Sequence, residues 1–392
     1  MLAGPESLVY RPAPERSLTS EQHPTGGAAT PIDAAEEPAP LSRLDKRRRN
    51  IRAVVASVVL VGAFVWILGR GGFPLLPAPG WLDKLKPFYF VLFCLGMVFN
   101  MLTRFARCHF LIAPLAKIPF RRTMSINAIG MALITYLPLR LGEMARPAML
   151  RERGHLSAWA VTGTVGAERI LDGLVFSGML LLGLAVAPPQ SPLPDHVGAF
   201  PVPVSVIPQT ARIAAVVFGL AFAIMAAFYW LRAWARSVTE RVVGLVSPKL
   251  AHRLADIVER LSDGLRFLTN WRYSLPYLVV TVASVASQVW AIEQLATAVG
   301  LPELTFMQAT VVIGVMALGF SAPNAPGFFG MVQLALYCGL ATYIAPSKVA
   351  VEGAVFVFLF YVVYLLNVSL LGVIALIVEF FATPAPVASR AA

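Results

Sequence analysis

Six long stretches of the chain are almost wholly apolar, and charged residues gather between them. About 20 apolar residues in a row suffice for a helix to cross the hydrocarbon core of a membrane. The pattern predicts six spans, at residues 51–69, 88–103, 159–187, 211–231, 275–299 and 351–378. The short alternating segments of a membrane β-barrel are absent, so the predicted fold class is an all-α polytopic membrane protein.

A seventh apolar segment, within residues 123–153, is broken by a proline. Its apolar run from Met124 to Pro138 would cover roughly 23 Å as a helix, less than the hydrocarbon thickness of about 30 Å. Charged residues follow at once, beginning with Arg140. We therefore expect a re-entrant hairpin, which enters the membrane and returns to the same side.

An eighth segment, within residues 306–345, is interrupted by the string SAPNAPGFFGMVQ, whose prolines and glycines cannot continue a regular helix. In lipid the freed backbone groups must be satisfied by protein or water, so such a break normally faces a cavity. This segment is predicted to be a second re-entrant hairpin. The alternative is an ordinary turn outside the membrane between two spans.

The net charge of +11 comes from basic residues that cluster beside membrane segments, at 43–52, 104–122 and 232–272. Residues 188–210 contain neither Lys nor Arg. The positive-inside rule places the basic loops and the N-terminus in the cytoplasm and the 188–210 loop outside. Basic residues at the inner surface can also hold anionic lipids, so no nucleic-acid partner is predicted.

With this sidedness the two hairpins enter the membrane from opposite faces. Each is flanked by spans, which gives an inverted repeat of span, broken hairpin and span, with about eight membrane segments in all. Paired interruptions of this kind point to a transport site near the bilayer midplane. The prediction requires both hairpins to be re-entrant.

The chain is predicted to comprise a disordered cytoplasmic tail at 1–44, a membrane domain at 45–380 and a short tail at 381–392. Residues 232–272 alternate charged positions with apolar ones at helical spacing, which predicts an amphipathic cytoplasmic insert. The three cysteines and five histidines have no spacing that indicates a disulfide or a metal site. No metal and no cofactor are predicted.

Ionisable residues of the first break and of the next span form a candidate site, which comprises Arg140, Glu143, Arg146, Glu168, Arg169 and Asp172. Charges at membrane depth cost a few kcal/mol or more each, so they usually face the bundle interior in pairs. We expect Arg140 or Arg146 to pair with Glu168 or Asp172, and Glu143 to face Arg169. The cluster is either a functional polar site or a structural ion-pair network. As a site, its guanidinium groups suit the phosphate of a lipid headgroup.

The strings LPLRLGEMARPAMLRERG and TGTVGAERILDGL resemble signatures of the flippase-like transmembrane domain of bacterial lysylphosphatidylglycerol synthases. APNAPGFFGMVQ is similar to the second break of that family. The resemblance covers roughly residues 50–380 and implies a protein of the bacterial inner membrane that moves a lipid between leaflets, with an anionic phosphate-containing or aminoacylated headgroup. It adds residues of the second break to the candidate substrate-binding set, namely Asn324, Pro326, Gly327, Gly330 and Gln333. Gln333 stands where the family often has Glu.

Synthases of that family carry a cytoplasmic acyltransferase-like domain after the membrane part, and this chain ends at Ala392. We therefore expect no enzymatic lysyl transfer, and a separate lipid-modifying enzyme is a candidate partner. Two alternatives remain. One is an intramembrane enzyme or enzyme subunit with Glu168 or Asp172 as general base, although no nucleophile, metal cluster or nucleotide loop is present. The other is a membrane scaffold for envelope synthesis that binds a partner through residues 232–272.

Overall fold

A computed structural model describes most of the membrane domain. The described residues are 55, 58–59, 61–66, 69–70, 76–137, 142–154, 156–190, 206–230, 265, 267, 269–321 and 325–382. The predicted tail at 1–44, nearly all of the 232–272 insert and about half of the first predicted span therefore lie outside them. Arg140 and Asn324 lie outside them as well.

Helices account for all the regular structure in the described residues. Those with bounds inside the described residues are α3 (Trp81–Lys84), α4 (Pro87–Ile112), α5 (Phe120–Tyr136), α6 (Ala145–Gly154), α7 (Ala158–Val186), α8 (Val206–Trp230), α11 (Trp271–Val299), α12 (Phe306–Ser321), the 3₁₀ turn η3 (Pro326–Phe328), α13 (Met331–Ala341) and α14 (Pro346–Ala382). The described residues of the first predicted span, among them 61–66, are also helical. Five of the helices, α4, α7, α8, α11 and α14, are long and apolar enough to cross a membrane. These five correspond to five of the six predicted spans.

The helix ends follow local sequence signals. Pro87 occupies the first turn of α4, where its missing N–H costs no hydrogen bond. Ser157 and Asn270 cap α7 and α11, each accepting a hydrogen bond of 3.2 Å from a backbone N–H of the first turn. Helix α11 ends at Val299, and the next residue, Gly300, has a φ of 91°, in the left-handed region that favours glycine.

Helix α4 is longer than predicted. The sequence prediction ended this span at Thr103, before the first arginine, but the helix continues to Ile112. Arg107 is buried within it, with only 5% of its surface exposed. The prediction was wrong because it treated the charged residues as the edge of the membrane, whereas they face carboxylates on a neighbouring helix.

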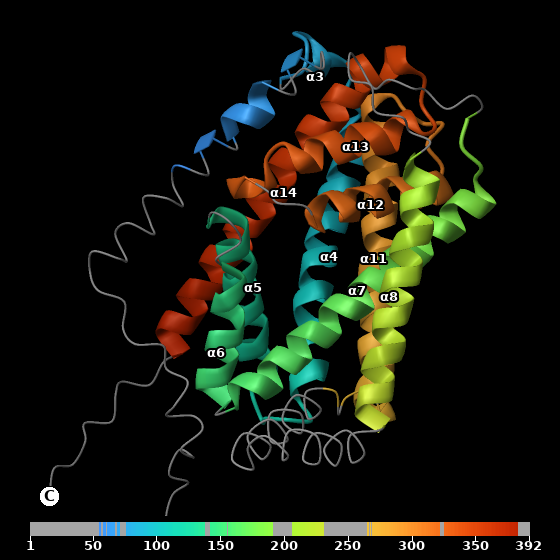
Figure 1. Cartoon of the computed structure of the whole chain (residues 1–392). Helices are drawn as coiled ribbons and strands as arrows, with labels where there is room; N and C mark the ends of the chain where they lie inside the picture. Colours follow the sequence, from blue (N-terminus) through green and yellow to red (C-terminus); the bar gives the residue numbers. More distant parts are fainter. Residues whose placement is uncertain are drawn as a thin grey trace, which may run out of the picture. The chain divides into compact units, whose positions relative to one another are not determined.

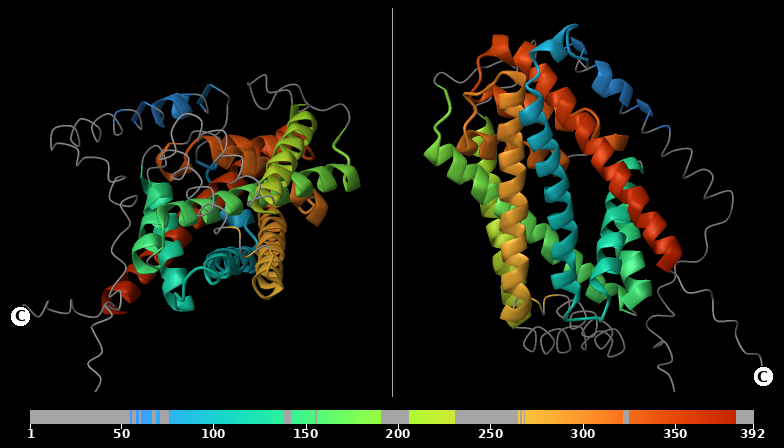
Figure 2. Two further views of the ribbon diagram at one scale, coloured as in Figure 1. Left: turned by 60° about the horizontal axis from the view of Figure 1, so that its bottom comes forward. Right: turned by 180° about the vertical axis from the view of Figure 1, so that it is seen from behind.

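Helices α4 and α11 run in opposite directions and lie side by side in both figures (Figures 1 and 2). A methyl group added at Gly96 would lie 2.9 Å from Cβ of Ala291, so this glycine allows the close approach. The Asn100 side-chain amide donates to the carbonyl oxygen of Ser284 at 2.6 Å. A small residue and an interhelical hydrogen bond thus join the two spans.

The two broken segments form pairs of short helices toward opposite ends of the bundle (Figures 1 and 2). Helices α5 and α6 pack together in the first, and α12 and α13 pack together in the second. The η3 turn of the second segment contacts α5 of the first, and α14 packs along α5. The two broken segments are therefore in contact with each other.

Two glycines bring α7 and α12 into close contact. A Cβ added at Gly183 would lie 2.7 Å from Cγ2 of Val311, and one added at Gly314 would lie 2.8 Å from Cβ of Leu180. Distances below about 3 Å leave no room for a side chain, because protein interiors are already close-packed. The absence of side chains at both positions sets the separation of the two helices.

We predict that Gly183→Ala and Gly178→Ala, both on α7, change stability in opposite directions. Gly183→Ala should cost about 1–3 kcal/mol through overpacking against Val311. No atom lies within 4 Å of a Cβ built at Gly178, so alanine there should add about 0.5–1 kcal/mol of helix stability. Thermal unfolding of the purified variants in one detergent checks this. Equal shifts of the two midpoints would contradict the described crossing.

Candidate functional site

The polar centre of the bundle is built around Arg107 of α4. Its guanidinium makes a two-point contact with Asp172, with Nη1 2.5 Å from Oδ1 and Nη2 2.6 Å from Oδ2. Nη2 also lies 3.1 Å from Oε1 of Glu168. The Arg107 and Glu168 side chains are 6% and 7% exposed. Because burial removes water, these contacts replace the hydration that the charges lose.

Glu168 also binds a second arginine. Its Oε2 lies 2.5 Å from Nη2 of Arg146, whose side chain is 12% exposed. The same Nη2 lies 3.0 Å from Sγ of Cys108. The predicted pairing of Arg146 with Glu168 is confirmed, and Glu168 bridges two arginines from different helices.

A looser pair lies at the edge of the cluster. Arg169 and Glu143 are 3.6 Å apart, and their side chains are 45% and 38% exposed. The prediction that they face one another is confirmed. Glu143 lies directly before α6, and Arg146 lies in its first turn.

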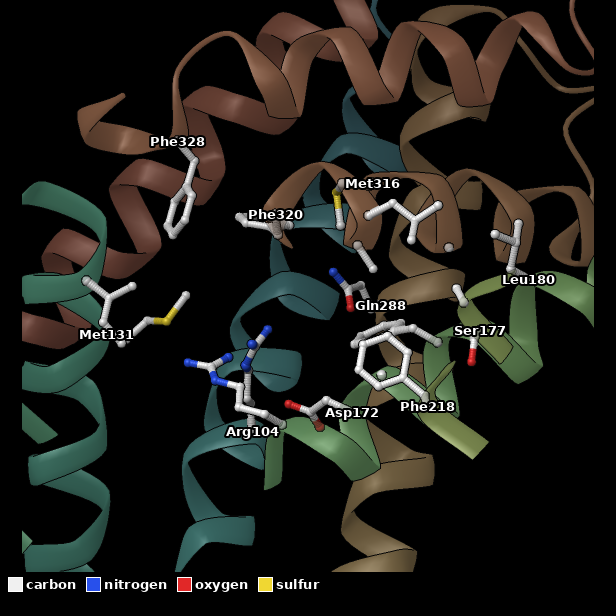
Figure 3. A pocket seen from close by; sticks show the side chains of 18 residues that line it. Arg104, Met131, Asp172, Ser177, Leu180, Phe218, Gln288, Met316, Phe320 and Phe328 are labelled. Atoms are coloured by element: carbon white, nitrogen blue, oxygen red, sulfur yellow. The ribbon is translucent and has the colours of Figure 1, made fainter. Parts of the chain in front are cut away.

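Next to this network lies a cavity of about 290 Å³ (Figure 3). Arg104, Arg169 and Asp172 line its charged side. Most of the other lining residues are apolar, from α5, α7, α8, α12 and η3, including Met131, Leu180, Phe218, Met316, Phe320 and Phe328. Ser177 of α7 and Gln288 of α11 are polar. The cavity therefore has a charged end and an apolar end, and both broken segments contribute to its wall.

The second break has a structural arrangement of its own. Oε1 of Gln333 accepts a 2.7 Å hydrogen bond from the backbone N–H of Gly330, at the start of α13. Gly327 and Gly330 have φ values of 75° and 92°. Phe328 borders the cavity, whereas Pro326, Gly327, Gly330 and Gln333 do not. The break thus presents an aromatic ring to the cavity, and Gln333 caps a helix.

Sequence reasoning missed Arg104 and Arg107, because both were assigned to a loop beside the membrane. A signal was present, since apolar residues continue between and beyond them, as in the string RFARCHFLI. Their spacing of three residues also places them on one side of a helix. Gln288 of α11 also borders the cavity.

Comparison with protein families gives a match to the lysylphosphatidylglycerol synthase TM region over residues 50–372. The chain belongs to this family. The match spans the charged network, the cavity and both broken segments. A search of curated proteins found no match, and a search of solved structures found none.

Within this membrane protein of the lysylphosphatidylglycerol synthase TM region family, the site is suited to binding through charge and shape. Its arginines and carboxylates come from three different helices, and an apolar space adjoins them. In the described part of the chain, no three His, Cys, Asp or Glu residues are grouped so that they could hold a metal ion. What the geometry offers is a place for an amphipathic molecule with a charged end.

Proposed function

We propose that this protein moves a lipid with a phosphate-containing or aminoacylated headgroup between the leaflets of the bacterial inner membrane, without covalent catalysis. The observation that carries the proposal is the cavity, in which the charged groups of Arg104 and Asp172 share one space with apolar side chains such as Met316 and Phe320. A lipid has the same division between headgroup and chain. Apolar pockets with a few placed polar groups are typical ligand sites.

The family supports this proposal, since its description names the membrane region of enzymes that make a lipid. The two broken segments support it as well. They lie toward opposite ends of the bundle, and Met131 from one and Phe328 from the other line the same cavity. In the proposed mechanism they are re-entrant hairpins of an inverted repeat and expose the cavity alternately to the two leaflets. The basic segments and the N-terminus are proposed to be cytoplasmic.

A tryptophan placed in the cavity tests the proposal. Ala214 lines the cavity from α8, whereas Val216 on the same helix is 69% exposed. We expect Ala214→Trp to abolish leaflet exchange of a fluorescent phospholipid in proteoliposomes, because it fills the space that the lipid would occupy. Val216→Trp should exchange the lipid at the wild-type rate.

Both variants must first show wild-type yield and gel-filtration behaviour. Exchange by Ala214→Trp at the wild-type rate would contradict transport through the cavity. Lipid conversion by the purified protein, detected by mass spectrometry, would instead favour an enzyme.

A further inference from the structure

The positive and negative charges of the cluster are not equal in number. Among the described residues it comprises four arginines, at 104, 107, 146 and 169, and three carboxylates, at 143, 168 and 172. Each carboxylate contacts an arginine other than Arg104, which favours its ionised form. One positive charge is therefore in excess.

Arg104 carries that excess. No hydrogen bond or ion pair joins its guanidinium to another residue in the described part of the chain, and it lines the cavity beside Asp172 (Figure 3). Asp172 already makes its two-point contact with Arg107. An arginine stays charged in any environment of this kind, so it needs a counter-ion.

A second group in the cavity lacks a protein partner. Gln288 of α11 is 8% exposed, and its side-chain amide makes no hydrogen bond within the described residues. The amide borders the cavity, where a bound molecule can reach its nitrogen and oxygen atoms. A natural explanation is that the amide serves a molecule in the cavity.

The two groups are neighbours. Gln288 and Arg104 border the same 290 Å³ cavity, and they also share the wall of a second space of about 10 Å³ between α4 and α11. In Figure 3 the Gln288 amide lies between Arg104 with Asp172 on one side and Met316 with Phe320 on the other. In this view the amide thus lies between the charged groups and two apolar side chains of α12.

We infer that the cavity selects a lipid with a net negative phosphodiester headgroup. Arg104 binds the phosphate, and the Gln288 amide donates a hydrogen bond to a carboxylic-ester oxygen between the phosphate and the acyl chains. The inference rests on the proposed function for its lipid ligand and names the class of lipid. A diacylglycerophospholipid presents phosphate, ester carbonyls and chains in the order that the cavity requires. A guanidinium binds a phosphodiester oxygen pair through two hydrogen bonds.

The same charge count disfavours an aminoacylated headgroup. Lysylation adds two ammonium groups to a phosphatidylglycerol, which turns its net charge from negative to positive. Placed beside Arg104, such a headgroup would add cations where one cation is already in excess, and like charges repel strongly in a poor solvent. The site therefore discriminates between the two headgroup types that the proposed function leaves open.

Binding to the purified full-length chain in detergent tests the inference. The ligands are phosphatidylglycerol, phosphatidylcholine, lysylphosphatidylglycerol and a polyprenyl phosphate. The last of these has no carboxylic ester between its phosphate and its chain. We expect phosphatidylglycerol to bind about tenfold or more tightly than lysylphosphatidylglycerol, with phosphatidylcholine between them. Arg104→Gln should remove this preference, while Arg212→Gln, at an exposed arginine of α8, should keep it.

Gln288→Leu should weaken phosphatidylglycerol binding about tenfold and leave polyprenyl phosphate binding unchanged. It should not lower the melting temperature of the lipid-free protein, because the amide has no protein partner to lose. Equal affinity for phosphatidylglycerol and lysylphosphatidylglycerol would overturn the charge selection. Weaker polyprenyl phosphate binding, or a destabilised lipid-free protein, would overturn the role of Gln288.

These outcomes can be separated from failure of the proposed function. Selective binding without leaflet exchange would leave the headgroup assignment standing and refute transport. Leaflet exchange at the same rate for anionic and cationic lipids would support transport and refute the headgroup assignment.

Discussion

Replacing Glu168 by glutamine is expected to lower the free energy of unfolding by about 3–5 kcal/mol, because it leaves a buried arginine without a counter-charge. Arg107 keeps its two-point contact with Asp172. Arg146 keeps only the contact with the Cys108 sulfur. Glutamine has nearly the same shape as glutamate, so the loss of stability reports the effect of removing the negative charge. Thermal unfolding of the purified protein in detergent, followed by tryptophan fluorescence, reports the change.

Two further variants make this result specific. Adding Arg146→Met to Glu168→Gln removes the orphaned cation and should restore much of the lost stability, since an unpaired buried charge causes most of the loss. Glu143→Gln breaks a half-exposed pair and should cost only about 0–1 kcal/mol. A double variant less stable than Glu168→Gln alone would show that Arg146 is not the residue that Glu168 neutralises.

Gly330→Ala is expected to cost about 3 kcal/mol or more, for two reasons that act together. The φ of 92° and ψ of −65° at this position lie in a region that other residues rarely adopt, at a cost of about 1–3 kcal/mol. An added Cβ would also lie 2.0 Å from Cγ of Phe64, so that ring must move as well. A lower yield of folded protein and a lower melting temperature are the expected observations.

The matched control for Gly330→Ala is Gly166→Ala. It adds the same methyl group, but no atom lies within 4 Å of a Cβ at Gly166. Its melting temperature should equal or exceed that of the wild type. If Gly330→Ala behaved in the same way, the backbone at the second break would differ from the one described.

Most of the fold could be predicted from the lengths of the apolar runs in the sequence. Residues 159–187 were predicted as a span, and α7 covers Ala158–Val186, because a long apolar run leaves no other stable structure in lipid. Prolines and glycines marked both breaks for the same reason. The extent of α4 could not be found in this way, since its last turns carry arginines whose partners lie far along the chain.

The candidate site was partly accessible to sequence. The cost of buried charge correctly paired Arg146 with Glu168 across 22 residues. The same reasoning could not rank Arg107 above other arginines, because the choice depends on which helix packs against α7. Gln288 and the cavity depend wholly on tertiary packing, since an amide in a span looks the same in sequence whether or not it has a partner.

The glycine contacts between helices have a consequence for how the chain tolerates substitution. At Gly96, Gly183 and Gly314 the limit is set by side-chain volume, since even a methyl group meets an atom within 3 Å. At exposed positions of the spanning helices such as Val216, the expected limit is polarity, because space is free there. In a library with every substitution at each position, tolerance should therefore follow side-chain size at the three glycines and hydrophobicity at the exposed positions. This difference would map the helix interfaces without a further structure.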